Sequence, residues 1–335
     1  MIGWLASNRV LKLPPSMFKQ EATPSELRRR EMFLGKLLTF ASAATDETPT
    51  VRCWSELSLK RALLTVRRRM DSPPRTSGDG LLRYLEEVCL VQTIPTQKPP
   101  GKAKSPVFYL LDVEAGGTAP SVDPLELLQA HHPAGVVCYF SALAIHDLTT
   151  QPPSSHHLAI PQSKRGSSTQ PTRTLKPRVA SAGAPRSGPN PLGTPVFLYG
   201  GLTYFISRRT FPLAHVQSRY VNSRTIVRYT TLEQTLLDTL HKPQRCGGPE
   251  VIFEAWERAV ELLDERRLLD CLESTGSRPS QRRLAAMLAT LDYRIRLPRL
   301  AEKLAPGVEP DDQEIPLLPG VASTRVDPRW AVQVP

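Results

Sequence analysis

Apolar residues recur with the spacing of an α-helix in three stretches of the first hundred residues. Thr23-Pro24-Ser25-Glu26 has the form of a helix start, because threonine can cap, proline suits the first turn and glutamate completes a capping box. A second helix is predicted over residues 57–70, and Pro73-Pro74 ends it. A third has an apolar face formed by Leu81, Leu82, Leu85, Val88 and Cys89.

Two short apolar runs after the third helix predict a β-hairpin. The runs "LVQTIP" and "VFYLLDV" flank a loop rich in proline and lysine, residues 96–106. Three helices followed by such a hairpin predict a winged helix-turn-helix, in which the third helix enters the major groove. We expect residues 20–118 alone to bind duplex DNA, although a small helical domain with a solvated hairpin is an alternative. The candidate DNA contacts are Lys60, Arg61, Arg67, Arg68, Arg83, Lys98, Lys102 and Lys104.

The rest of the pattern predicts a second, mixed region. Residues 124–150 predict a short helix, a turn and an apolar helix, and the runs 195–209 and 219–231 are typical of strands. Residues 163–194 are basic and poor in apolar side chains, so we expect a disordered insertion there, with "HLAI" before it as a strand. The sequence predicts an α+β protein with an N-terminal extension (1–22), a winged helix-turn-helix domain (23–118), a mixed α/β domain (119–300) and a proline-rich tail (301–335).

Length and composition agree with this division. A chain of 335 residues exceeds the usual size of a single core, which favours two domains. Its 33 prolines indicate long irregular connections, since the ordinary share is roughly 5%. The five cysteines have no paired spacing, so we expect reduced thiols and neither disulfides nor a metal site. No apolar run is long enough to span a membrane and no signal peptide is recognisable, so we expect a soluble, cytoplasmic protein.

The net charge of +11 is unevenly distributed. Residues 1–118 carry 18 Lys/Arg against 12 Asp/Glu, and residues 151–195 carry six bases and no acid. Residues 196–335 are close to balance, with 19 bases and 17 acids. A basic front and a basic insertion favour a polyanionic partner, of which nucleic acid is the simplest, although basic loops are often only solvated.

Residues 230–248, "TTLEQTLLDTLHKPQRCGG", hold side chains that an active site could use. Thr230 precedes Glu233 by three residues, which predicts a capping box and a structural role for the glutamate. Asp238 lies five positions from Glu233, so the two carboxylates should point to different faces of the helix. No second base or oxyanion motif accompanies His241, and no nucleotide-binding loop is present, so we expect no enzyme and no cofactor.

Three segments together resemble the AbiEi-type family of antitoxins and transcriptional regulators. They are "YFSALAIHDL" at 139–148, "TTLEQTLLDTLHKPQRCGGPEVIFEAWERA" at 230–259 and "QRRLAAMLATLDY" at 281–293. The resemblance covers roughly residues 80–295, and it differs in the long insertion and in Gln234, where relatives often carry arginine. The motif residues carried over by the resemblance are Ser141, Thr230, Glu233, Leu237, Asp238, Gly247 and Gly248.

The resemblance implies a type IV antitoxin, which is not an enzyme. Such a protein binds operator DNA through a winged helix, represses its own operon and counteracts an AbiEii-type nucleotidyltransferase toxin encoded beside it. The sequence leaves open whether it touches the toxin directly, and it leaves the oligomeric state open, a dimer on DNA included. The alternatives are a stand-alone DNA-binding regulator without a toxin and a metal-dependent nuclease with dispersed acids.

Overall fold

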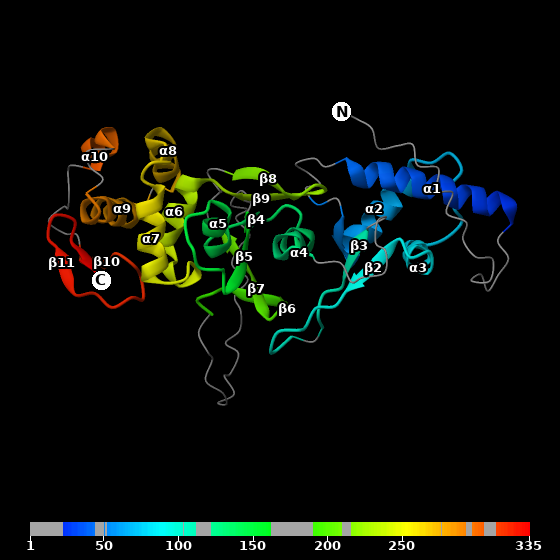
Figure 1. Ribbon diagram of the computed structural model, residues 1–335, viewed down its shortest axis with the longest axis horizontal. Helices are drawn as coiled ribbons and strands as arrows, with labels where there is room; N and C mark the ends of the chain where they lie inside the picture. Colours follow the sequence, from blue (N-terminus) through cyan, green and yellow to red (C-terminus); the bar gives the residue numbers. More distant parts are fainter. Residues whose placement is uncertain are drawn as a thin grey trace, which may run out of the picture.

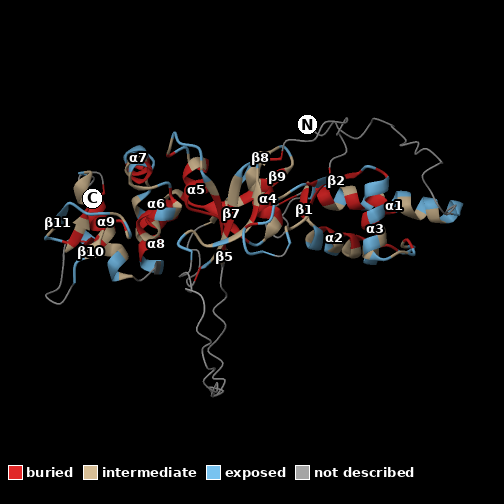
Figure 2. Ribbon diagram, turned by 90° about the horizontal axis from the view of Figure 1, so that it is seen from below, coloured by how far each residue is buried: buried red, intermediate tan, exposed pale blue. Residues whose placement is uncertain are grey.

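The chain is an α+β protein in this computed structural model, as its pattern predicts (Figure 1). Three regions follow one another along the long axis of the molecule: N-terminal helices with a small sheet, a central sheet, and C-terminal helices with a second small sheet (Figures 1 and 2). The predicted extension at 1–22 and most of the predicted insertion lie outside the described residues. The structure describes residues 23–43, 50, 52–102, 104–111, 122–161, 190–209, 216–275, 277–292, 297–304 and 313–335.

All three helices predicted in the N-terminal region are present. They are α1 (Pro24–Ser42), α2 (Glu56–Arg68) and α3 (Gly78–Glu87). Strand β1 (Cys53–Ser55) lies between α1 and α2, and β2 (Val91–Ile94) and β3 (Phe108–Leu111) follow α3. The strands form an antiparallel sheet in the order β1-β3-β2. Residues at the predicted helical spacing form one core, which includes Phe33, Leu37, Leu59, Leu63, Leu81 and Leu85.

Two local predictions in this region are wrong. Thr23 precedes α1 but makes no capping hydrogen bond, and its hydroxyl lies 3.1 Å from the Ser25 hydroxyl instead, so the predicted capping box does not form. Cys89 is exposed, because the chain leaves α3 there with a positive φ of 56°. Serines cap the other two helices: Ser55 Oγ accepts from the Ser58 amide and Ser77 Oγ from the Gly80 amide.

A six-stranded mixed sheet forms the centre of the molecule. Its order is β6-β7-β5-β4-β9-β8, with β5–β7 and β4–β9 parallel and the other pairs antiparallel. The segment "HLAI" lies in β5, as predicted, and the last residue of the predicted insertion begins β6. The strands are β4 (Val136–Val137), β5 (Ser155–Pro161), β6 (Thr194–Tyr199), β7 (Leu202–Arg209), β8 (Val216–Asn222) and β9 (Thr225–Thr230).

The two predicted helices of residues 124–150 are α4 (Pro124–His131) and α5 (Phe140–Ile145). Successive strand residues point to opposite faces of the sheet. Leu158 therefore packs into the core under α4, and its neighbour Ala159 packs into the core that contains α5 and the C-terminal helices. The central sheet is thus covered on both faces.

The C-terminal region contains α6 (Leu232–His241), a 3-10 turn (Pro243–Arg245), α7 (Pro249–Ala259), α8 (Glu265–Thr275), α9 (Arg278–Thr290) and α10 (Pro298–Leu304). Residues 250–273 carry apolar side chains at helical spacing throughout, but the structure has two helices there. The break lies at residues 260–264, where Asp264 Oδ1 accepts from the Arg267 amide and so caps the start of α8.

The proline-rich segment predicted as a tail is part of the fold. Within residues 313–335, β10 (Ile315–Pro316), β11 (Arg325–Asp327) and β12 (Val332–Val334) form a sheet in the order β10-β12-β11. Arg282 of α9 donates to the carbonyl oxygens of Gln313 and Trp330 at 2.7 Å and of Ala331 at 2.6 Å. The segment also supplies core residues: Leu317, Leu318, Trp330, Val332 and Val334.

The N-terminal region shares a core with the central sheet. Residues from both sides of this joint, among them Phe108, Leu110, Leu127, Phe197 and Tyr204, belong to one buried cluster. In an isolated chain of residues 20–118, the apolar side chains that this region contributes to the cluster would be exposed to water. The structure therefore differs from the expectation of a self-contained N-terminal domain.

A buried ion pair crosses the same joint. Arg52 donates to both oxygens of Glu126 on α4, at 2.9 and 2.6 Å, and the Glu126 side chain is fully buried. Asn222, at the end of β8, also donates to Glu126. This network fixes the position of the N-terminal region relative to the central sheet.

Candidate functional site

The candidate DNA-contacting residues all lie in the N-terminal region, but Lys60 is already neutralised. Its ammonium group lies 2.7 Å from Glu56 Oε1 on α2 and 2.6 Å from Asp79 Oδ1 on α3. The hydrogen bonds to Asp79 and Glu56 raise the pKa of Lys60. Lys60 therefore joins the first turns of α2 and α3, and a role in phosphate binding is not favoured.

The other seven candidates are without an ion pair to any described carboxylate. Four of them are arginines on α2 and α3, and six of the seven are exposed, with Arg67 half-buried. Arg83 is exposed on the outer face of α3, together with Glu86, Glu87 and Asp79, of which Asp79 pairs with Lys60. That face therefore carries more negative than positive charge.

A stronger concentration of cations lies where α2 ends. The Lys36 ammonium group on α1 donates to the Arg69 carbonyl at 3.4 Å, and the Arg69 guanidinium lies 5.9 Å from the centre of the Phe40 ring. Arg67 and Arg68 are adjacent in the last turn of α2, where the helix dipole favours positive charge. We call Lys36, Arg67, Arg68 and Arg69 the helix-end cluster.

The β2–β3 hairpin presents the remaining three lysines. Lys98, Lys102 and Lys104 are exposed on its loop. The loop extends toward the central sheet (Figure 1), where Gln97 and Leu198 of β6 exchange two backbone hydrogen bonds of 2.9 Å. The lysines therefore project from a hairpin that is held at both the small sheet and the central sheet.

The motif residues of the resemblance lie elsewhere, under the central sheet. Ser141 of α5 is buried, and its hydroxyl lies 3.1 Å from His156 Nδ1 and accepts from the His157 amide at 3.3 Å. Tyr139, which precedes α5, has a positive φ of 58° and turns the chain from β4 into the helix. Ser141 therefore connects α5 to β5 through His156 and His157.

The capping prediction for α6 is one residue out of place. Thr231 is the capping residue, and its side chain accepts from the Gln234 amide at 3.4 Å. Thr230 instead bonds the Thr235 hydroxyl at 2.7 Å. Glu233 does not cap the helix: its Oε1 accepts from the Asp264 amide at 3.3 Å, and its buried Oε2 has no hydrogen-bond partner in the described part of the chain.

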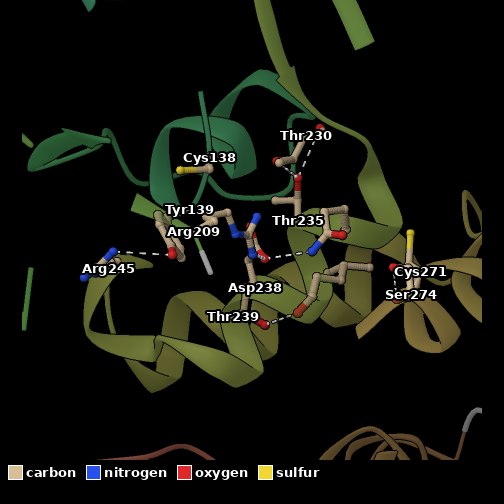
Figure 3. Close-up of polar contacts among 12 residues, drawn as sticks. Cys138, Tyr139, Arg209, Thr230, Thr235, Asp238, Thr239, Arg245, Cys271 and Ser274 are labelled. Carbon is tan, nitrogen blue, oxygen red and sulfur yellow. Dashed lines mark hydrogen bonds and ion pairs between the residues drawn. The ribbon is translucent and has the colours of Figure 1, made fainter. Parts of the chain in front are cut away.

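Asp238 belongs to a buried ion pair that the sequence does not reveal (Figure 3). Arg209, at the end of β7, donates to both carboxylate oxygens, one of them at 3.1 Å, and Gln234 donates to Oδ1 at 2.9 Å. The side chains of Arg209 and Asp238 are only 3% and 1% exposed. As predicted, Glu233 and Asp238 have separate partners, so they do not form an acid–base pair.

The same close-up shows Tyr139 between two arginines (Figure 3). The Arg209 and Arg245 guanidinium groups lie 6.0 and 5.1 Å from the centre of its ring, and Arg245 donates to its hydroxyl at 3.4 Å. Burial raises the pKa of the Tyr139 hydroxyl, so it is neutral at physiological pH. The cluster holds β7, α5 and α6 together.

Gly247 and Gly248 form the turn into α7. Both have positive φ angles, 87° and 100°. A Cβ atom at Gly247 would lie 2.8 Å from the Phe140 ring and 2.9 Å from Val251, so the turn also needs the absence of a side chain. Leu237 of α6 is buried in the large C-terminal core.

Buried thiols and imidazoles in the central region are held neutral. Burial raises the pKa of Cys138 and Cys246, and it raises that of Cys271 to about 12. Burial lowers the pKa of His156 to about 4 and that of His157 to about 3. Groups in these protonation states are poor nucleophiles and poor acceptors of a proton at neutral pH.

The histidine pKa values predict sensitivity to acid. Burial lowers the folded-state pKa of His156 from 6.5 to about 4, so between these pH values the unfolded chain binds a proton at His156 and the folded chain does not. The free energy of unfolding is therefore unaffected by His156 above pH 6.5 and falls as the pH drops toward 4. Across this window the His156→Gln variant should show a pH dependence of the free energy of unfolding that is shallower by about 1 kcal/mol per pH unit. Urea unfolding at several pH values measures this, and equal slopes for variant and wild type would contradict it.

Among the residues that the structure describes, no group of three or more His, Cys, Asp or Glu side chains could hold a metal ion. Nor is any helix in that part both long and apolar enough to cross a membrane.

Comparisons with known proteins give little further guidance. No family model matches the sequence, and no curated protein matches it. Among solved structures, the chain is similar to the Rv2827c protein from Mycobacterium tuberculosis, with 13% identity, a TM-score of 0.48 and 90% of each chain covered. A likeness this distant carries no conclusion about function.

Proposed function

We propose that the chain binds double-stranded DNA through residues 23–111, which form a winged helix-turn-helix. The observation that carries the proposal is the order helix-strand-helix-helix-strand-strand, closed by a β1-β3-β2 sheet and bordered by cations that pair with no described carboxylate. In this arrangement α2 and α3 are the helix-turn-helix and the β2–β3 hairpin is the wing.

The charge distribution assigns different roles to the candidate residues. Because the outer face of α3 carries three carboxylates, affinity comes mainly from the helix-end cluster and the hairpin lysines, which neutralise phosphates. Arg83 is the exposed cation on that face, and in this proposal it is the residue that contacts a base edge. Lys60 takes no part, since two carboxylates already hold it.

A fluorescence anisotropy titration of the full chain with duplex DNA from upstream of its own reading frame tests the proposal. Binding should weaken steeply with salt, and Arg67→Ala/Arg68→Ala should lower the log–log salt slope by about 0.9 for each phosphate that the variant no longer neutralises. The matched control is Arg266→Ala/Arg325→Ala, which removes the same charge from exposed C-terminal positions. If both double variants bind like the wild type, the N-terminal region is not the DNA-binding surface.

We propose further that the protein is an AbiEi-type antitoxin, which represses its own operon and counteracts a nucleotidyltransferase toxin encoded next to it. The motif residues on which the resemblance rests support this reading in one respect. Ser141 and Asp238 make buried contacts, and Gly247 lies in a tight turn. These residues therefore stabilise the fold of the central region. Counteraction of the toxin is then a property of the folded surface and needs no catalytic group.

Co-expression with the neighbouring gene in a growth assay tests this role. Glu233→Gln should keep full protection, because the amide oxygen can accept from Asp264 as Glu233 Oε1 does. Arg67→Ala/Arg68→Ala should also protect, while a reporter fused to the operon's promoter is derepressed. Loss of protection by a folded Glu233→Gln protein would assign Glu233 an active role. A neighbouring gene without toxicity would favour the stand-alone regulator.

A further inference from the structure

Two glutamates occupy the last turn of α3, where a helix disfavours negative charge. Glu86 and Glu87 are the final residues of α3, both are exposed, and the last turn holds no basic residue. The partial negative charge at the C-terminus of a helix is stabilised by cations and destabilised by carboxylates. The two glutamates therefore weaken the end of α3, and residues that break a local rule in this way are candidates for function.

Neither glutamate forms an ion pair within the described part of the chain. Arg83 precedes them by three and four residues, a spacing at which salt bridges form on a helix. The charge of Arg83 instead acts on Asp79 in the first turn: the hydrogen bond from Lys60 lowers the pKa of Asp79, and Arg83 adds to the effect. Asp79 is therefore neutralised by cations, whereas Glu86 and Glu87 have no cation partner among the residues that the structure describes.

Arg83, Glu86 and Glu87 share one exposed face of α3, opposite the buried leucines of the same helix. A helix rises about 1.5 Å per residue, so Arg83 and Glu87 are about 6 Å apart along the axis of α3. That separation is less than two base-pair steps of about 3.4 Å. In a major groove, where the proposed helix-turn-helix places α3, the two side chains reach neighbouring base pairs.

We propose that this face of α3 restricts binding to DNA with neighbouring guanine and cytosine bases, a step that rests on the proposed DNA binding. Arg83 donates to O6 and N7 of a guanine, and Glu87 accepts from the N4 amino group of a cytosine. A carboxylate can only accept hydrogen bonds, and cytosine presents a donor without an acceptor in the major groove. Adenine presents a donor beside its N7 acceptor, which disfavours a carboxylate.

The same glutamates select against other sequences. A carboxylate in the groove is repelled by the phosphates, and only a correctly placed cytosine offsets that repulsion with a hydrogen bond. The helix-end cluster and the hairpin lysines supply affinity for any duplex, since phosphates carry no sequence information. Affinity and selectivity are therefore assigned to different surfaces of the N-terminal region.

Selection of bound duplexes by the full chain, from a pool with about 10 randomised base pairs (one helical turn), tests the inference by sequencing. The wild type should enrich guanine and cytosine at two neighbouring positions. Glu87→Gln should replace the preferred cytosine by adenine, because glutamine pairs with adenine N6 and N7. Arg83→Ala should lose the guanine preference and keep the cytosine preference.

The double variant Glu86→Gln/Glu87→Gln gives a second readout. It should bind a duplex made only of A·T pairs about tenfold more tightly than the wild type, because the repulsion is removed. Its melting temperature should be equal or higher, since the last turn of α3 loses two unfavourable charges. The matched control Glu257→Gln/Glu302→Gln removes the same charge from exposed C-terminal positions. Its A·T affinity should stay within about twofold of the wild type, because distant charges are screened.

The outcomes separate this inference from the proposed function. A chain that binds DNA but enriches no base, or a Glu87→Gln protein that selects the wild-type sequences, would overturn the inference alone. An A·T affinity that is the same in the wild type and in Glu86→Gln/Glu87→Gln would overturn the selection against other sequences. A chain that binds no duplex even at low salt would overturn the inference and the proposed function together.

Discussion

Replacing Asp238 with alanine should lower the free energy of unfolding by about 3–5 kcal/mol, because it leaves the Arg209 guanidinium buried without its carboxylate. Both side chains are almost fully buried, and Gln234 would lose its acceptor as well. A charge in this position cannot turn toward water. Chemical denaturation followed by circular dichroism gives the free energy directly.

The control for this variant is an exposed ion pair. Lys303 and Glu273 pair with side chains that are 40% and 60% exposed, so Glu273→Ala should cost less than about 1 kcal/mol. The double variant Arg209→Met/Asp238→Leu should recover most of the stability, because it removes both buried charges. An Asp238→Ala protein as stable as the wild type would show that Arg209 finds another partner or reaches solvent.

Ending the chain at residue 312 should prevent stable folding. The missing segment would uncover the apolar residues on α9 and remove three carbonyl partners from Arg282. The point variant Trp330→Ala should by itself cost about 3–5 kcal/mol, because Trp330 is buried in the C-terminal core.

Val326→Ala is the matched control for Trp330→Ala, since Val326 lies in the same small sheet but is 43% exposed. Its effect should stay within about 0.5 kcal/mol. Thermal unfolding of the truncated and substituted chains compares all three. A chain of residues 1–312 that melts at the wild-type temperature would show that the segment is an appendage after all.

The parts of the fold that the sequence predicts are those that depend on local periodicity. Helices α1, α2 and α3 follow from apolar residues at helical spacing, and the short apolar run "HLAI" forms a strand, as predicted. The small C-terminal sheet is not predicted because its strands are two or three residues long, too short to show a period. The break between α7 and α8 is not predicted because apolar residues continue across it.

The site is less predictable, since its decisive contacts join distant residues. Nothing near Lys60 in sequence reveals that Asp79 lies 2.6 Å from it, although Glu56, four residues earlier on the same helix, suggests an ion pair by its spacing. Arg209 and Asp238 lie on different elements and meet only in the folded chain. The interpretation of residues 230–248 as structural agrees with their buried contacts, but its stated reason is wrong, because Glu233 does not cap α6.

The shared core between the N-terminal region and the central sheet limits how this protein can be recombined with others. A chimera that grafts residues 23–111 onto an unrelated body would leave Phe108 and Leu110 facing a surface that was not shaped for them. Glu126 on α4 would have to travel with Arg52, and β6 with Gln97. In evolution, as in engineering, the smallest transplantable unit is the N-terminal region together with α4 and its sheet, so new binding specificities should arise by substitution within the chain and not by exchange of modules.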